Sequence, residues 1–220
     1  MTPEIWVAIG AVFLGLAAVA GGLAMFALRG AWDAVAIGLR VAALAALIVA
    51  LIAAVIVQGQ WTAADPQQAI LSLVVAMLAV HLVLAWRLGA GSTGPMVDIV
   101  ALALSLVSVF AIEVGAPGLA CVQQSPLFQA HWVLFSLGGG SVLVAGSAGL
   151  MLTLRKGLEW RGRDPRLPGW IPLYALLTQA TILGVVALGA GLAIRAWWAW
   201  QASGLHGNSN PRQVWMAIAW

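Results

Sequence analysis

Six long apolar stretches occupy most of the 220-residue chain. Most of them approach the roughly 20 residues that an α-helix needs to cross about 30 Å of hydrocarbon. Because a backbone in lipid must satisfy its own hydrogen bonds, stretches of this length are expected to be transmembrane helices. They run over residues 5–28, 39–57, 69–84, 97–112, 131–154 and 171–194, and a seventh begins at residue 214.

Composition supports the same interpretation. Hydrophobic residues make up 63% of the chain and charged residues 8%, whereas a soluble domain carries about 25% charged residues. The sequence therefore predicts an all-α, polytopic integral membrane bundle with six complete spans plus the start of a seventh. Residues 1–220 are expected to form a single transmembrane domain.

Basic residues predict the orientation of the bundle, because Lys and Arg are enriched in cytoplasmic connections. The outer connections hold only Arg195 and Arg212 of the ten Lys and Arg residues. This asymmetry predicts an outer N-terminus and a cytoplasmic loop over residues 155–169, in a bacterial-type inner (plasma) membrane. Without aromatic interleaving, the basic residues indicate contacts to lipid and not to nucleic acid. The eight remaining basic residues fall on the inner side: Arg29, Arg40, Arg87, Arg155, Lys156, Arg161, Arg163 and Arg166.

Two outer segments, about residues 113–130 and 196–212, are too polar to span a membrane. They follow the fourth and sixth spans, so they emerge on one face, and chemistry at the outer surface is expected between them. Cys121 in the first segment is expected to be a free thiol or to form an intermolecular bond. The basic loop 155–169 is expected to be a solvated connection.

Polar residues within the spans admit a structural or a functional interpretation. His81 is either a metal ligand or proton relay, or a histidine hydrogen-bonded to a neighbouring helix. Asp98 and Glu113 are expected to reach water at the two ends of the fourth span, without a functional role. Small residues such as Gly139 and Gly146 predict that the fifth span is a packing centre, because they let backbones approach closely.

Histidine and tryptophan residues at the outer face suggest a haem site. Imidazole ligates haem iron, and tryptophan rings offer flat apolar surface at the membrane interface. The alternative is that the tryptophans form the aromatic belt that membrane proteins place at the headgroup level. The candidate haem-binding residues are His131, His206, Trp132, Trp197, Trp198 and Trp200, with His131 and His206 as the iron ligands.

Three segments carry a resemblance to a known family: residues 59–73 (GQWTAADPQQAILSL), 126–137 (PLFQAHWVLFSL) and 210–220 (NPRQVWMAIAW). In order and expected topology they are similar to segments of CcsA-type cytochrome c assembly proteins, over nearly the whole chain. Ser136 stands where that family carries a ligand histidine, so the chain resembles a shortened relative with fewer ligands. His131 and His206 are the candidate substitutes.

The resemblance implies haem handling at the outer face during cytochrome c assembly, with haem as the cofactor. The implied partners are other integral membrane proteins, including an apocytochrome c or a second assembly subunit. No catalytic activity is implied, because thioether attachment uses cysteines of the acceptor. The competing hypothesis is a haem-free structural subunit of a respiratory or photosynthetic membrane complex. A transporter is less favoured, since no buried charge pair or interrupted helix is expected.

The orientation can be tested by cysteine labelling. An impermeant thiol reagent added to intact cells should label Cys121 from outside, while a cysteine introduced between residues 155 and 166 should react only after permeabilisation. The reverse pattern at the two positions would overturn the orientation.

Overall fold

The computed structural model describes residues 2–26, 31–58, 65–110, 126–161 and 167–203. Within these ranges all regular secondary structure is helical, as the sequence predicts. The helices are α1 (Pro3–Phe26), α2 (Ala31–Gln58), α3 (Pro66–Leu88), the 3-10 turn η1 (Gly91–Thr93), α4 (Gly94–Phe110), α6 (Pro126–Trp160) and α7 (Trp170–Ser203).

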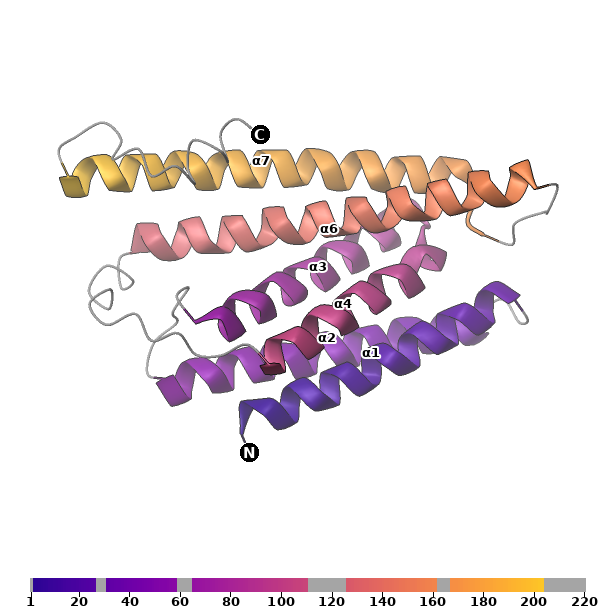
Figure 1. The fold of residues 1–220 in the computed structure, drawn as a ribbon, viewed down its shortest axis with the longest axis horizontal. Helices are drawn as coiled ribbons and strands as arrows, with labels where there is room; N and C mark the ends of the chain where they lie inside the picture. Colours follow the sequence, from indigo (N-terminus) through magenta and orange to yellow (C-terminus); the bar gives the residue numbers. More distant parts are fainter. Residues whose placement is uncertain (1, 27–30, 59–64, 111–125, 162–166, 204–220) are drawn as a thin grey trace.

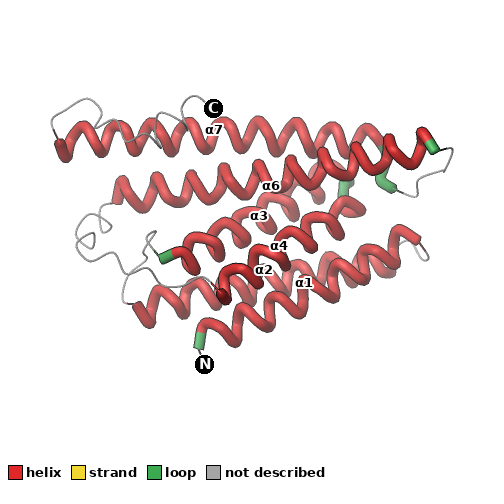
Figure 2. Tube along the Cα trace, in the orientation of Figure 1, coloured by secondary structure: helices red, strands yellow, loops and turns green. Residues whose placement is uncertain are grey.

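Successive helices run in opposite directions through one elongated bundle (Figures 1 and 2). The C-terminal ends of α1, α3 and α6 therefore gather at one end of the bundle with the N-terminal ends of α2, α4 and α7. We call this the basic end, because Arg87, Arg155, Lys156 and Arg161 lie there. The opposite end, where α6 begins and α7 ends, is called the aromatic end.

Five of the helices are long and apolar enough to cross a membrane, which identifies a membrane protein. The sixth, α4, is apolar but shorter, at 17 residues. The predicted seventh segment lies outside the described residues. Six complete spans therefore remain a prediction.

All three predicted loops are wrong in part, because the helices extend past the apolar stretches. Residues 126–130 of the predicted outer segment 113–130 are the first residues of α6. Residues 155–160 continue α6, and residues 196–203 continue α7. Neither of these last two segments contains a proline, and the single Gly157 in residues 155–160 does not stop the helix, so the backbone stays helical after the hydropathy falls. Trp197 and Trp198 consequently lie on the last turns of α7 and not in a loop.

Local signals explain where α3 begins and ends. The Asp65 carboxylate caps the helix by accepting a hydrogen bond from the Gln67 backbone N–H at 2.9 Å, and Pro66 occupies the first turn. Gly89 ends the helix in the left-handed conformation at φ 63°, where its N–H donates to the Ala85 carbonyl. The turn η1 then leads directly into α4, so α3 and α4 form a tight hairpin.

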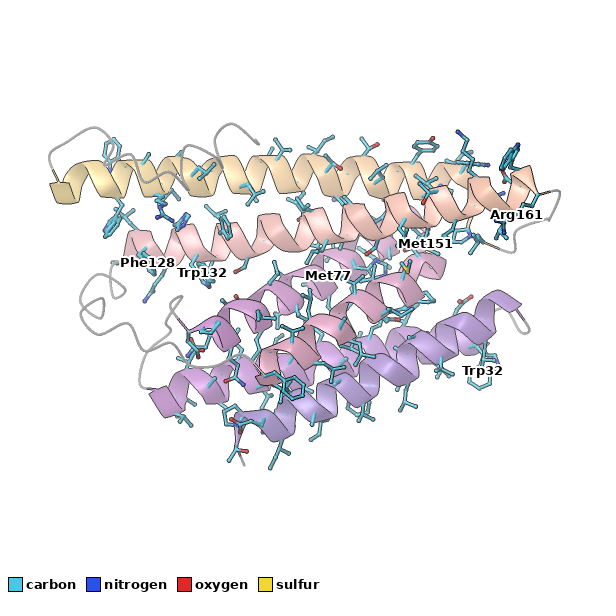
Figure 3. The ribbon with its side chains drawn as sticks, in the orientation of Figure 1. Trp32, Met77, Phe128, Trp132, Met151 and Arg161 are labelled. Atoms are coloured by element: carbon cyan, nitrogen blue, oxygen red, sulfur yellow. The ribbon has the colours of Figure 1, made fainter. Side chains whose placement is uncertain are left out.

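Helix α3 forms the centre of the bundle. It contacts α2, α4, α6 and α7, whereas α1 packs mainly along α2 and α4, and α7 mainly along α6. The side chains of Leu71, Val74, Met77 and Leu78 on α3 are fully buried in the main apolar core (Figure 3). This position lets α3 join the α6–α7 hairpin to the other three helices.

Glycines on α6 set how closely this helix approaches its neighbours. A Cβ added at Gly140 would lie 2.6 Å from the Met77 backbone nitrogen on α3, and one at Gly138 would lie 3.0 Å from the Leu188 backbone nitrogen on α7. A Cβ added at Gly139 would lie 2.7 Å from Leu73 Cδ1, so this position is also too close to its neighbour for a larger residue. The expected packing role of Gly146 is wrong, because that glycine is exposed and has no atom within 4 Å of an added Cβ.

Substitution of Gly140 by alanine should destabilise the protein by about 1–3 kcal/mol, because the added methyl group would push the α3 backbone away. The matched variant Gly146→Ala should leave stability unchanged or raise it by about 0.5–1 kcal/mol, as expected for glycine in an open helix position. Thermal unfolding in detergent measures both. Equal melting temperatures for the two variants would show that α6 and α3 do not approach this closely.

Candidate functional sites

At the aromatic end, His131 lies in the second turn of α6 and faces α7. Its side chain is buried, and its Nδ1 lies 2.8 Å from the Gly191 carbonyl oxygen of α7. Because a carbonyl oxygen only accepts, Nδ1 carries the hydrogen and donates it. The unprotonated Nε2 keeps its lone pair, which is the state in which imidazole ligates a metal.

Aromatic rings surround His131 on α6. The ring centroids of Phe128 and Phe135 lie 6.5 Å and 5.9 Å from that of the imidazole. Trp198 of α7 meets Phe128 edge-on at 6.2 Å, and Trp132 stacks on Phe135 at 6.0 Å. The structure therefore brings His131, Trp132 and Trp198 into one aromatic cluster.

Of the remaining predicted residues of this site, the structure describes only the Trp197 side chain. The Trp197 side chain is 53% exposed, as an interfacial tryptophan would be. His206, Cys121 and Glu113 lie outside the described residues, and so does the Trp200 side chain. In the described part of the chain, no three His, Cys, Asp or Glu side chains are grouped to hold a metal ion.

Ser136 joins α6 to α3. Its hydroxyl lies 3.1 Å from the Ser72 hydroxyl, and both side chains are buried. Hydroxyl pairs of this kind link transmembrane helices where no water is present. At this position the chain carries an interhelical hydrogen bond.

A second candidate site, which the sequence does not predict, lies inside the bundle toward the basic end. Arg40 on α2 and Asp98 on α4 form an ion pair in which the side chains are 2% and 0% exposed. The predictions that Arg40 belongs to an inner connection and that Asp98 reaches water are both wrong. The expectation of no buried charge pair, which makes a transporter less favoured, is wrong as well. Gly94 and Gly21 leave the volume that the guanidinium occupies, since a Cβ at Gly94 would overlap its terminal atoms.

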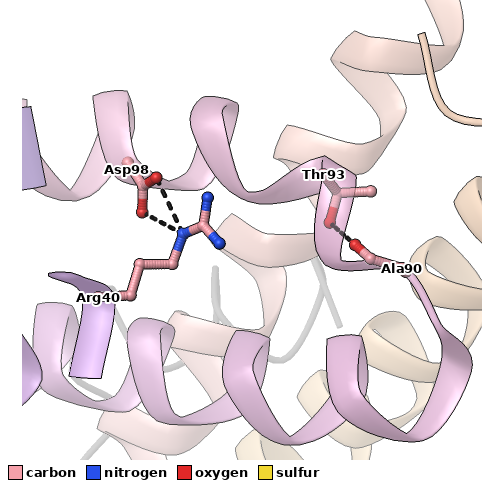
Figure 4. A network of polar contacts seen from close by, with 4 residues as sticks. All are labelled: Arg40, Ala90, Thr93 and Asp98. Carbon is pink, nitrogen blue, oxygen red and sulfur yellow. Dashed lines mark hydrogen bonds and ion pairs between the residues drawn. The ribbon is translucent and has the colours of Figure 1, made fainter. Parts of the chain in front are cut away.

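The pairing uses only one edge of the guanidinium. Arg40 Nε donates to Asp98 Oδ1 at 2.8 Å and to Oδ2 at 2.9 Å, while the two terminal nitrogens point away from the carboxylate (Figure 4). Among the described residues, Arg40 Nη2 has no hydrogen-bond partner although it is buried. Nη2 is therefore left to donate to another group.

His81 on α3 belongs to the same polar region. It is fully buried and close enough to Arg40 to interact with it electrostatically. Neither ring nitrogen has a hydrogen-bond partner in the described parts of the chain. The predicted hydrogen bond from His81 to a neighbouring helix is therefore not formed by any described residue.

The positions of Arg40 and Asp98 within apolar helices are a sequence signal for the buried ion pair. Trp32 and Asp33 mark the start of α2, and Arg40 follows two helical turns later among apolar neighbours. A charge at that depth is costly and requires a partner. Asp98, one turn into an apolar helix, offers the complementary charge.

Arg155 organises the connection between α6 and α7. Its Nε donates to Glu159 at 2.8 Å, its Nη1 donates to the backbone carbonyls of Leu167 and Pro168, and its guanidinium lies 5.5 Å from the Trp170 ring centroid. The expectation of a purely solvated connection is wrong for these residues, because Arg155 at the end of α6 binds the residues that lead into α7.

Comparison of the chain with family models, curated proteins and solved structures gives no match. Function is therefore argued from the geometry of these two sites.

Removing one partner of the buried ion pair should lower the free energy of unfolding far more than replacing both partners by apolar residues. Arg40→Met leaves the Asp98 charge unpaired and should lower the free energy of unfolding by about 3–5 kcal/mol, whereas Arg40→Met combined with Asp98→Leu should be close to neutral. The exposed pair gives the control, since Glu159→Gln should cost at most about 1 kcal/mol. Denaturation in mixed micelles compares the four proteins. A double variant as unstable as the single one would contradict the role of the charges.

Proposed function

We propose that the chain is a six-span membrane protein that binds haem at the aromatic end and takes part in cytochrome c assembly. His131 is the axial ligand from this chain. The observation that carries the proposal is the hydrogen bond from His131 Nδ1 to the Gly191 carbonyl. Metal-ligating histidines characteristically donate the second ring N–H to a carbonyl or carboxylate, which fixes the tautomer and the orientation of the ring.

The surroundings of His131 fit a haem group in three respects. Phe128 and Phe135 give the apolar contacts that a porphyrin needs. Arg195 on α7 interacts electrostatically with His131, and a guanidinium suits a propionate carboxylate. The buried Trp132 Nε1 has no partner among the described residues and is a further donor for a bound group.

When bound, haem would supply an iron centre whose reactivity depends on its axial ligands. His131 would hold that iron through Nε2, and α7 would keep the imidazole oriented through Gly191. We propose His206 as the second ligand and Trp197, Trp198 and Trp200 as the apolar shelf. These assignments follow from the residue types that the sequence places at the outer face. The cytoplasmic position of the basic end follows from the charge pattern.

The second candidate is a haem-free structural subunit of a larger membrane complex. Of the five span-length helices, α7 has the smallest share of buried residues in its most apolar stretch. Ile182 and Val186 on this helix are 59% and 62% exposed. This face would contact lipid in either case, and a partner helix in a complex.

Haem titration of the detergent-purified protein separates the two candidates. The wild-type protein should develop a Soret band on adding haemin, and His131→Gln should weaken haem binding at least tenfold, because a ligand is lost. His81→Gln is the matched control, since it removes the other buried histidine from a different part of the bundle. Its spectrum and affinity should equal those of the wild type.

Absence of a Soret band in the wild-type protein after haemin addition would favour the structural subunit. Equal affinities for the wild-type and His131→Gln proteins would remove His131 from the site, even if haem binds.

A further inference from the structure

We propose that Arg40, His81 and Asp98 form a hydrated proton-binding site inside the bundle, in which Asp98 takes up one proton from water at the basic end. The three side chains come from α2, α3 and α4, and each is at most 2% exposed. Asp98 is the fifth residue of α4, about 6 Å along the helix from its start at Gly94. The site is therefore buried but close to the basic end.

Unmet hydrogen-bonding capacity indicates that the site holds water. Arg40 Nη2, His81 Nδ1 and His81 Nε2 are buried without a partner among the described residues. Leaving such a group unpaired costs about 1–3 kcal/mol, and more for a charged one. Arginine only donates, whereas a neutral imidazole has one donor and one acceptor nitrogen. Water can accept from the guanidinium and can also donate to the imidazole, so it satisfies both.

The arrangement of charges makes Asp98 the group that accepts the proton. The Arg40 guanidinium is the positive charge of this site. Its positive charge lies close enough to His81 to oppose a second positive charge on the imidazole. Among the described residues, the Asp98 carboxylate accepts only the shared Nε–H of Arg40, so its remaining lone pairs are open to a proton or to water.

The proton balance is simple. A hydronium ion from the solvent gives one proton to the carboxylate, which becomes a carboxylic acid, and one water molecule remains. The net charge of the three side chains changes from zero to +1. The new O–H can donate to water. Proton uptake therefore converts the charged tie between α2 and α4 into a weaker hydrogen bond.

The other titratable side chains on the helices that pack against α4 are not candidates for the proton-binding role of Asp98. Helix α4 packs against α1, α3, α6 and η1. Among the described residues, η1 contributes no titratable group, and the single one of α1 lies at the aromatic end. Those of α3 and α6 other than His81 lie at the helix ends or in exposed positions. The full set is Glu4 on α1, His81 and Arg87 on α3, and His131, Arg155, Lys156 and Glu159 on α6; α2 adds Asp33 and Arg40.

Infrared difference spectroscopy of the protein in lipid vesicles tests the site. Lowering the pH from about 8 to about 5 should produce the C=O stretching band of a buried carboxylic acid. The band should be absent from Asp98→Asn and unchanged in Glu159→Gln, which removes an exposed carboxylate. In Arg40→Met the midpoint should move by at least one unit toward higher pH, a tenfold gain in proton affinity, because the stabilising cation is gone.

Asp98→Asn and Arg40→Met both leave a buried group unpaired, so the double variant Arg40→Met/Asp98→Leu supplies a version expected to fold. It should show no carboxyl band. Three results would overturn the proposal: no band in the wild type across this range, a band that persists without Asp98, or an unchanged midpoint in Arg40→Met. Titration of His81 instead, seen as histidine ring bands that vanish in His81→Gln, would also overturn it.

Discussion

Close approach of backbones is the constraint on which the bundle depends. In lipid, apolar side chains gain little by leaving their surroundings, so helices associate through packing and hydrogen bonds. Helix α6 meets this constraint with consecutive glycines, of which Gly140 lies against the α3 backbone and Gly138 against Leu188 of α7. The Ser72–Ser136 hydroxyl pair adds a polar link one turn away. Without these contacts, the α6–α7 hairpin would lose its main attachment to α3.

Most of the fold could be predicted from hydropathy because helix is the structure that satisfies a backbone in lipid. The ends of α6 and α7 could not, because hydropathy reports the membrane boundary and not where a helix stops. Arg155 and Trp197 are polar or interfacial residues that remain helical. The start of α3 is different, since Asp65 and Pro66 are explicit capping signals.

The two candidate sites differed in how much the sequence could indicate. His131 and Trp132 are conspicuous in an apolar chain, and Trp198 comes shortly after Arg195, where the last apolar stretch ends. The aromatic cluster could therefore be predicted. The hydrogen bond to Gly191 could not, because a backbone carbonyl leaves no mark in the sequence. Arg40 and Asp98 each resembled an interfacial charge when considered alone. Their pairing depends on how α2 and α4 are oriented around their axes, which packing decides.

The separation of Arg40 and Asp98 by 58 residues also affects how the protein is made. Synthesis proceeds from the N-terminus, so α2 is complete well before α4 emerges. During this interval the guanidinium has no carboxylate partner and must stay near the headgroups or water. The hairpin of α1 and α2 can settle at its final depth only after α4 arrives. Assembly of the N-terminal half therefore has an obligatory order, imposed by a single ion pair.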